Sequence, residues 1–94
     1  MAIQQGANVT ELRGVAKQFN AKAGEVENIK NTLNALISNN IPANWAGRDA
    51  EQFRNEWQST GMKSLAKLIE QLREASRTMN QNATAQEQTS NSLS

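Results

Sequence analysis

The chain has 94 residues, a formal net charge of +1 and no cysteine, histidine or tyrosine. This length favours one domain, and the near-zero net charge provides no general attraction to nucleic acid or to anionic membranes. Without cysteine and histidine the chain lacks disulfide chemistry, the commonest general base and the usual zinc ligands. We therefore expect no catalytic residues, no cofactor and no metal site.

The first predicted element is an amphipathic helix over about residues 8–40. Its apolar residues recur at seven-residue spacing in three neighbouring rows, which is typical of a helix with a broad apolar face. The rows are Leu12, Phe19, Val26 and Leu33; Val15, Ile29 and Leu36, interrupted by Lys22; and Ala16, Ala23 and Ile37. Asn8 or Thr10 is the expected N-cap.

A turn is predicted over about residues 41–47. The backbone of Ile41 is pushed out of the helical region because Pro42 follows it. Asn44 or Gly47 is the expected N-cap of the next helix. Glycine at position 47 also permits a backbone conformation or a close approach that other residues resist.

A second helix is predicted over about residues 48–80, followed by a polar, flexible tail over about 81–94. Steps of four residues recur near Gly61, which shifts the phase of the apolar stripe as a stutter does. Asp49 and Glu51 lie in the first turns, where the helix dipole favours acidic side chains. The stripe is Ala50, Phe53, Trp57, Gly61, Leu65, Leu68, Leu72, Ala75 and Met79.

The two helices predict an all-α fold, an antiparallel helical hairpin. One hairpin leaves part of two broad apolar faces in water, so we expect a four-helix bundle on dimerisation. The residues expected to pack within the hairpin and the dimer are Leu12, Phe19, Val26, Leu33, Phe53, Trp57, Leu65, Leu68 and Leu72.

The tripeptide Trp45-Ala46-Gly47 lies at the predicted hinge. Residues two apart do not share a helix face, so Trp45 and Gly47 are not both core positions of one regular helix. Two interpretations stay open: Trp45 plugs the end of the bundle, or it stays partly exposed at the rim of a groove and binds a partner.

A central Trp45-x-Gly47 between two long amphipathic helices, in a chain of about this length, resembles the WXG family of type VII (ESX) secretion proteins, the early-secreted-antigen-like group. The resemblance covers about residues 8–80. It implies a secreted, virulence-associated helical hairpin that forms homo- or heterodimers. It also implies export of the folded dimer from the cytoplasm without a cleaved signal peptide, driven by an FtsK/SpoIIIE-type ATPase. In this family Trp-x-Gly of one subunit and the C-terminal end of its partner form a composite export signal.

One part of the family pattern is missing. Many members carry Tyr-x-x-x-Asp/Glu after the second helix, whereas the nearest frame here places Ala83 at the aromatic position and Glu87 at the acidic one. Either a partner subunit supplies the signal in a heterodimer, or the chain belongs to a homodimeric branch with a looser C-terminal pattern. The near-neutral charge favours the homodimer.

A different class of function explains the same stripes. A cytosolic coiled-coil adaptor or chaperone for a larger helical partner needs the same two amphipathic helices, with Trp45 acting only as a plug. Membrane permeabilisation is a weaker alternative, because the polar faces are not enriched in lysine or arginine; interaction with membranes stays an open question.

Overall fold

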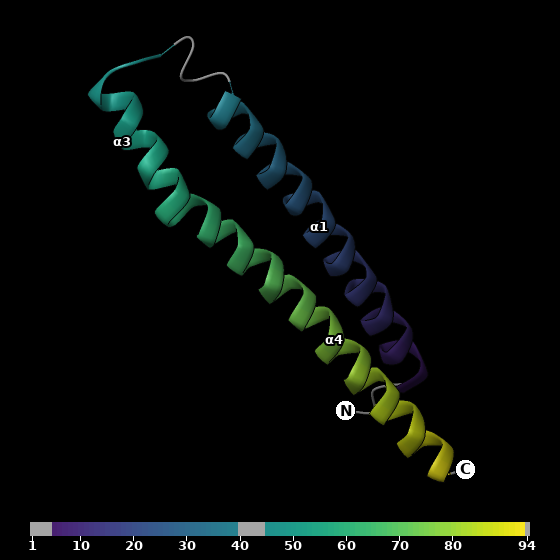
Figure 1. Cartoon of the computed structure of the whole chain (residues 1–94). Helices are drawn as coiled ribbons and strands as arrows, with labels where there is room; N and C mark the ends of the chain where they lie inside the picture. The colour runs from purple at the N-terminus through teal and green to yellow at the C-terminus, as the bar shows by residue number, and fades with distance from the viewer. Residues whose placement is uncertain (1–4, 40–44, 94) are drawn as a thin grey trace. The chain divides into compact units, whose positions relative to one another are not determined.

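The computed structural model describes residues 5–39 and 45–93 (Figure 1). The chain begins with helix α1, Gln5–Asn39. A second arm follows, made of α3 (Arg48–Glu56), the π-helix η1 (Trp57–Gly61) and α4 (Met62–Leu93). The described residues contain no strand, and the two arms pack as a helical hairpin, so the predicted all-α hairpin is confirmed.

The hairpin consists of two compact units. One joins Met1–Lys22 with Gln71–Ser94, and the other is Ala23–Glu70. In the first unit, Ser76 of α4 donates a hydrogen bond to the backbone carbonyl of Ala16 in α1 over 2.7 Å. In the second, the indole Nε1 of Trp57 donates to Oδ1 of Asn34 over 3.0 Å. Each unit therefore has its own polar link between α1 and the second arm.

Each unit has its own buried residues between α1 and the second arm, and we call these nine residues together the hairpin seam. Five of them are alanine or serine, and all four alanines have no exposed surface. Small side chains let two helix backbones approach closely, which is why the hydroxyl of Ser76 reaches a carbonyl of the other helix. The seam residues are Val9, Ala16, Ala23, Ile37, Ala50, Trp57, Ile69, Ser76 and Ala83.

The three predicted rows of α1 differ in burial. The alanine-containing row, Ala16, Ala23 and Ile37, is buried in the seam. The row that contains Phe19 is half-buried except at Leu33, which is 36% exposed, and the apolar residues of the row that contains Ile29 are exposed. On α1, the row that contains both alanines thus lies in the seam, and the two rows without alanine lie at the edge of the hairpin or outside it.

Two helix boundaries differ from the prediction. Helix α1 begins at Gln5, so Asn8 and Thr10 lie inside it and neither is its N-cap. Helix α4 continues to Leu93, so a flexible tail from about residue 81 is wrong. The reason is tertiary: Ala83 is fully buried in the seam, and packing of this kind stabilises a helix whose composition is polar.

The start of the second helix agrees with the prediction. Gly47 is the N-cap of α3, and Asp49 and Glu51 lie in its first turn. The predicted roles of Ile41, Pro42 and Asn44 in the turn lie outside the described residues.

The phase shift predicted near Gly61 falls within the π-helix η1. A β-carbon built on Gly61 would lie 2.6 Å from Cε3 of Trp57, so the absence of a side chain lets the indole lie against the helix backbone. Gly14 differs, since a β-carbon there meets nothing within 4 Å.

This contrast predicts opposite effects of the same substitution. Alanine is favoured over glycine in a helix by about 1 kcal/mol, so G14A is expected to raise the melting temperature by about 4 °C. G61A is expected to lower it, because the new methyl group displaces the Trp57 ring. Thermal unfolding followed by circular dichroism checks both variants. A stabilising G61A would contradict the close packing of Trp57 on Gly61.

Candidate functional site

The backbone at Gly47 requires glycine. Its φ is 108° and its ψ is −174°, a conformation that residues with a β-carbon rarely adopt. A β-carbon there meets nothing within 4 Å, so the requirement comes from the backbone angle and not from crowding. The carbonyl of Gly47 accepts a hydrogen bond from the amide of Glu51 over 3.1 Å, which closes the first turn of α3.

Trp45 lies two residues before this cap, with 43% of its surface exposed. Its ring centroid is 6.0 Å from that of Phe53, and the ring planes are tilted by 41°. Phe53 is itself 40% exposed. Within this unit, Trp45 and Phe53 form an aromatic pair that is available to a partner, although tryptophan and phenylalanine usually bury most of their surface.

The second tryptophan has a different environment. Trp57 is 9% exposed, and its indole N–H is satisfied by Asn34. Buried tryptophans usually find such a partner for their polar group. Trp57 is therefore a packing residue of the seam, and Trp45 is the tryptophan whose ring is exposed to water.

Large apolar side chains are exposed on both arms of the unit Ala23–Glu70. On α1, Ile29 is 54% exposed and Leu36 is 48% exposed. On the second arm, Leu68 is 41% exposed. With Leu33 and Phe53, these residues form what we call the outer apolar set: Ile29, Leu33, Leu36, Phe53 and Leu68. Exposed apolar residues mark a site of protein–protein contact where they form a contiguous patch.

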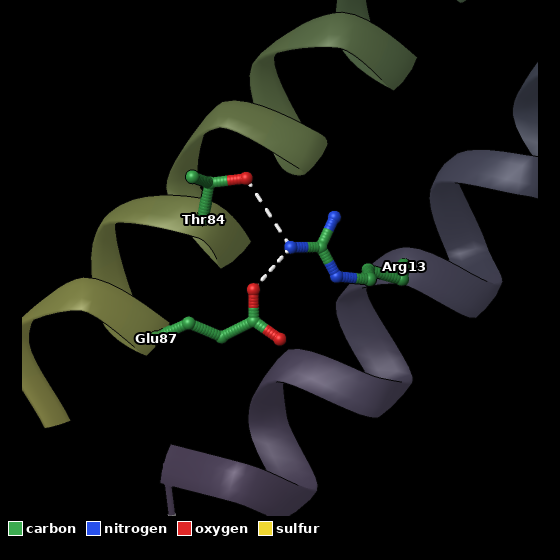
Figure 2. Close-up of polar contacts among 3 residues, drawn as sticks. All are labelled: Arg13, Thr84 and Glu87. Atoms are coloured by element: carbon green, nitrogen blue, oxygen red, sulfur yellow. Dashed lines mark hydrogen bonds and ion pairs between the residues drawn. The ribbon is translucent and has the colours of Figure 1, made fainter. Parts of the chain in front are cut away.

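Glu87, the predicted remnant of a C-terminal signal, is held by α1 in the other unit. Figure 2 shows the guanidinium of Arg13 bonded to both Thr84 and Glu87. Nη2 of Arg13 donates to the Thr84 hydroxyl over 3.2 Å and to the Glu87 carboxylate over 2.5 Å. The two charged side chains are 39% and 49% exposed, so solvent screens the ion pair and it contributes little to stability.

A shallow groove lies between α1 and α4 in the same unit. It is lined by Glu11, Leu12, Val15 and Gln86. Among the described residues, Oε1 of Gln86 is buried without a hydrogen-bond partner.

The predicted packing residues fall into three groups. Trp57 is in the seam, and Leu33, Phe53 and Leu68 belong to the outer apolar set. The others are half-buried: Leu12, Phe19, Val26, Leu65 and Leu72.

Sequence reasoning missed the polar partners Asn34, Ser76 and Arg13. The burial of Ser76 was predictable, because it is seven residues from both Ile69 and Ala83 and therefore lies on the same face of the helix. Nothing in the sequence pairs Arg13 with Glu87, since only the fold brings them together.

No group of three or more acidic side chains that could hold a metal ion occurs in 5–39 and 45–93. None of the helices in these ranges is long and apolar enough to cross a membrane.

Comparison with known proteins identifies the class to which this hairpin belongs. Residues 6–91 match the WXG100 family, described as proteins of 100 residues with WXG. This chain is therefore a member of the WXG100 family, the small helical proteins associated with type VII secretion. Members are secreted by type VII systems, typically form dimers with WXG partners and are not known as enzymes. No curated protein and no solved structure gave a significant match.

The Arg13–Glu87 contact predicts a local effect on the end of α4. R13Q is expected to raise amide hydrogen exchange over residues 84–93 by about two- to fivefold, because an exposed ion pair contributes at most about 1 kcal/mol. Hydrogen exchange followed by mass spectrometry measures this change.

R77Q is the matched control. Arg77 pairs with Glu74 three residues away on the same helix, so its loss leaves the link between α1 and α4 intact. Equal exchange rates in R13Q and wild type would show that Arg13 does not order this segment.

Proposed function

We propose that this chain is an early-secreted-antigen-like substrate of a type VII secretion system. It leaves the cytoplasm as a folded dimer, without a cleaved signal peptide. Outside the cell it acts through protein–protein contacts, as an effector or as the co-export partner of another protein. Membership of the WXG100 family supports the route, and the exposed Trp45 supports the mode of recognition.

The exposed Trp45–Phe53 pair is the observation that carries the proposal. A ring with 43% of its surface in water contributes little to the stability of one hairpin. It gains a role when a second surface covers it, because aromatic side chains dominate the energetics of interfaces. The Trp45-x-Gly47 motif thus binds the export machinery, for which an FtsK/SpoIIIE-type ATPase is the proposed partner.

The burial pattern supports dimerisation. Five of the nine seam residues are alanine or serine, while each member of the outer apolar set keeps between 36% and 54% of its surface in water. A second hairpin covers the aliphatic members of this set and completes a four-helix bundle, which leaves the Trp45–Phe53 pair to the export machinery. We propose a homodimer. A second WXG protein as partner would bury the same residues. The oligomeric state of the purified chain distinguishes the homodimer from the heterodimer, because a heterodimeric chain does not self-associate.

The role of Glu87 is part of the same proposal. It is the acidic half of the C-terminal export signal, and Arg13, which also bonds to Thr84, holds it against α1 in the free chain. The aromatic half is absent at Ala83, whose side chain is buried in the seam.

The test is export from a cell that carries a type VII system. W45A is expected to reduce the amount of protein in the medium at least about tenfold, which corresponds to the loss of roughly 1.4 kcal/mol of binding. The amount inside the cell and the melting temperature should stay near wild type, because the Trp45 ring is largely outside the seam.

Q52A is the control for the export assay. Gln52 is an exposed residue of α3 that bonds only to Glu56 on the same helix. Export of Q52A at the wild-type level is expected. Equal export of W45A and wild type would refute the role given to Trp45.

A further inference from the structure

The buried residues of the second arm are not evenly spaced. On α1, Ala23 and Ile37 of the seam are fourteen residues apart, which is two heptads. On the second arm, Ala50 and Trp57 are seven apart, but the next seam residue, Ile69, follows after twelve. Twelve is one more than the eleven residues that complete three turns of a regular α-helix.

One extra residue has a large effect on a regular helix. At about 100° per residue, a step of eleven returns to within about 20° of the starting direction, whereas a step of twelve misses it by about 120°. In an unbroken α-helix the side chain of Trp57 would therefore point away from the seam if that of Ile69 pointed into it. Both are buried, so the extra residue is taken up between them.

The π-helix η1 takes up this residue. The amide of Met62 bonds to the carbonyl of Trp57, five residues back instead of four. A single widened turn of this kind adds one residue without changing the direction of the helix that follows, and such turns occur often at functional sites.

Three residues hold the widened turn in place. Trp57 is anchored to α1 through Asn34, and its ring lies against the backbone of Gly61. Asn34, Trp57 and Gly61 are therefore positioning residues. They fix where along the second arm the extra residue is accommodated.

The widened turn also determines where Phe53 points. In a regular helix Phe53 would lie about 160° from Ile69, almost opposite the seam. With one residue taken up by η1, the angle falls to about 60°, on the same flank as Leu68. The Trp45–Phe53 pair then lies on the side of the second arm that carries the exposed Leu68.

We infer that the second arm contains one extra residue and that the π-helix η1 accommodates it, which sets the register of the helix before it relative to the helix after it. This register keeps the Trp45–Phe53 pair on the same side of the arm as Leu68, the side that a second copy of this chain covers. The identity of the covering molecule rests on the function proposed above. The register itself rests on the spacing and burial of Trp57 and Ile69.

This inference predicts that one residue can be removed from the second arm without loss of thermal stability or of dimerisation. Deletion of Ser59, an exposed residue of η1, converts the twelve-residue step into eleven and lets the arm continue as a regular α-helix. The expected result is a melting temperature equal to or above that of wild type. The dissociation constant of the dimer, measured by sedimentation equilibrium, should stay within about threefold of wild type.

Deletion of Thr32 is the matched control. Thr32 is an exposed residue of α1 in the same unit, but α1 has no widened turn that could compensate. Its removal turns Ala23 and Ile37 out of line, so we expect a lower melting temperature and dimerisation weakened at least about tenfold. Insertion of one alanine after Ser59 is expected to resemble the Thr32 deletion.

The outcomes separate the two claims. If the Ser59 deletion lowers the melting temperature as much as the Thr32 deletion, the register inference is wrong, whether or not the chain dimerises. If the wild-type chain stays monomeric while only the Thr32 deletion is destabilising, the register inference holds and the proposed homodimer is wrong.

Discussion

The small-residue seam of the hairpin is the constraint on which the other features depend. Its alanines are completely buried, and the Ser76 hydroxyl bonds to a backbone carbonyl of α1, which requires a close approach of the two helices. Close helices leave little room between them, and large side chains such as Trp57, Ile37 and Ile69 enter the seam at a few positions. The exposed leucines, Ile29 and Phe53 lie outside it, where the single hairpin leaves 36% to 54% of each residue in water. The proposal that a second molecule covers these side chains rests on this division.

The same seam explains two features of the second arm that its local sequence does not. It orders the end of α4, because Ala83 packs there and Arg13 reaches Thr84 and Glu87 beside it. It also requires the π-helix, since Trp57 and Ile69 both belong to the seam but are one residue too far apart for an α-helix. Seam packing thus overrides the local preferences of the sequence at both places. At the hinge, in contrast, Gly47 acts through its backbone angle alone.

Much of the fold was predictable from the sequence, because seven-residue apolar spacing and the Trp-x-Gly hinge are local signals. The helix ends were less predictable. The composition of residues 81–93 favours disorder, whereas the burial of Ala83 and the contacts of Arg13 with Thr84 and Glu87 favour a helix there. The seam was also hard to assign, since three neighbouring rows of α1 have similar spacing and the row with the smallest side chains is the buried one. For the candidate site, the exposure of Trp45 was one of two open interpretations, whereas the Arg13–Glu87 contact has no sequence signal at all.

Isotope-filtered NOE spectroscopy on a mixture of methyl-labelled and unlabelled chains tests most directly whether large apolar residues, and not the alanine seam, join two copies. The expected result is intermolecular NOEs to the methyl groups of Ile29 and Leu36, which are about half exposed in one chain. The methyl groups of Ala16 and Ala23, which are buried inside the hairpin, should show none. Absence of intermolecular NOEs at Ile29 and Leu36, or their presence at the two alanines, would contradict this arrangement.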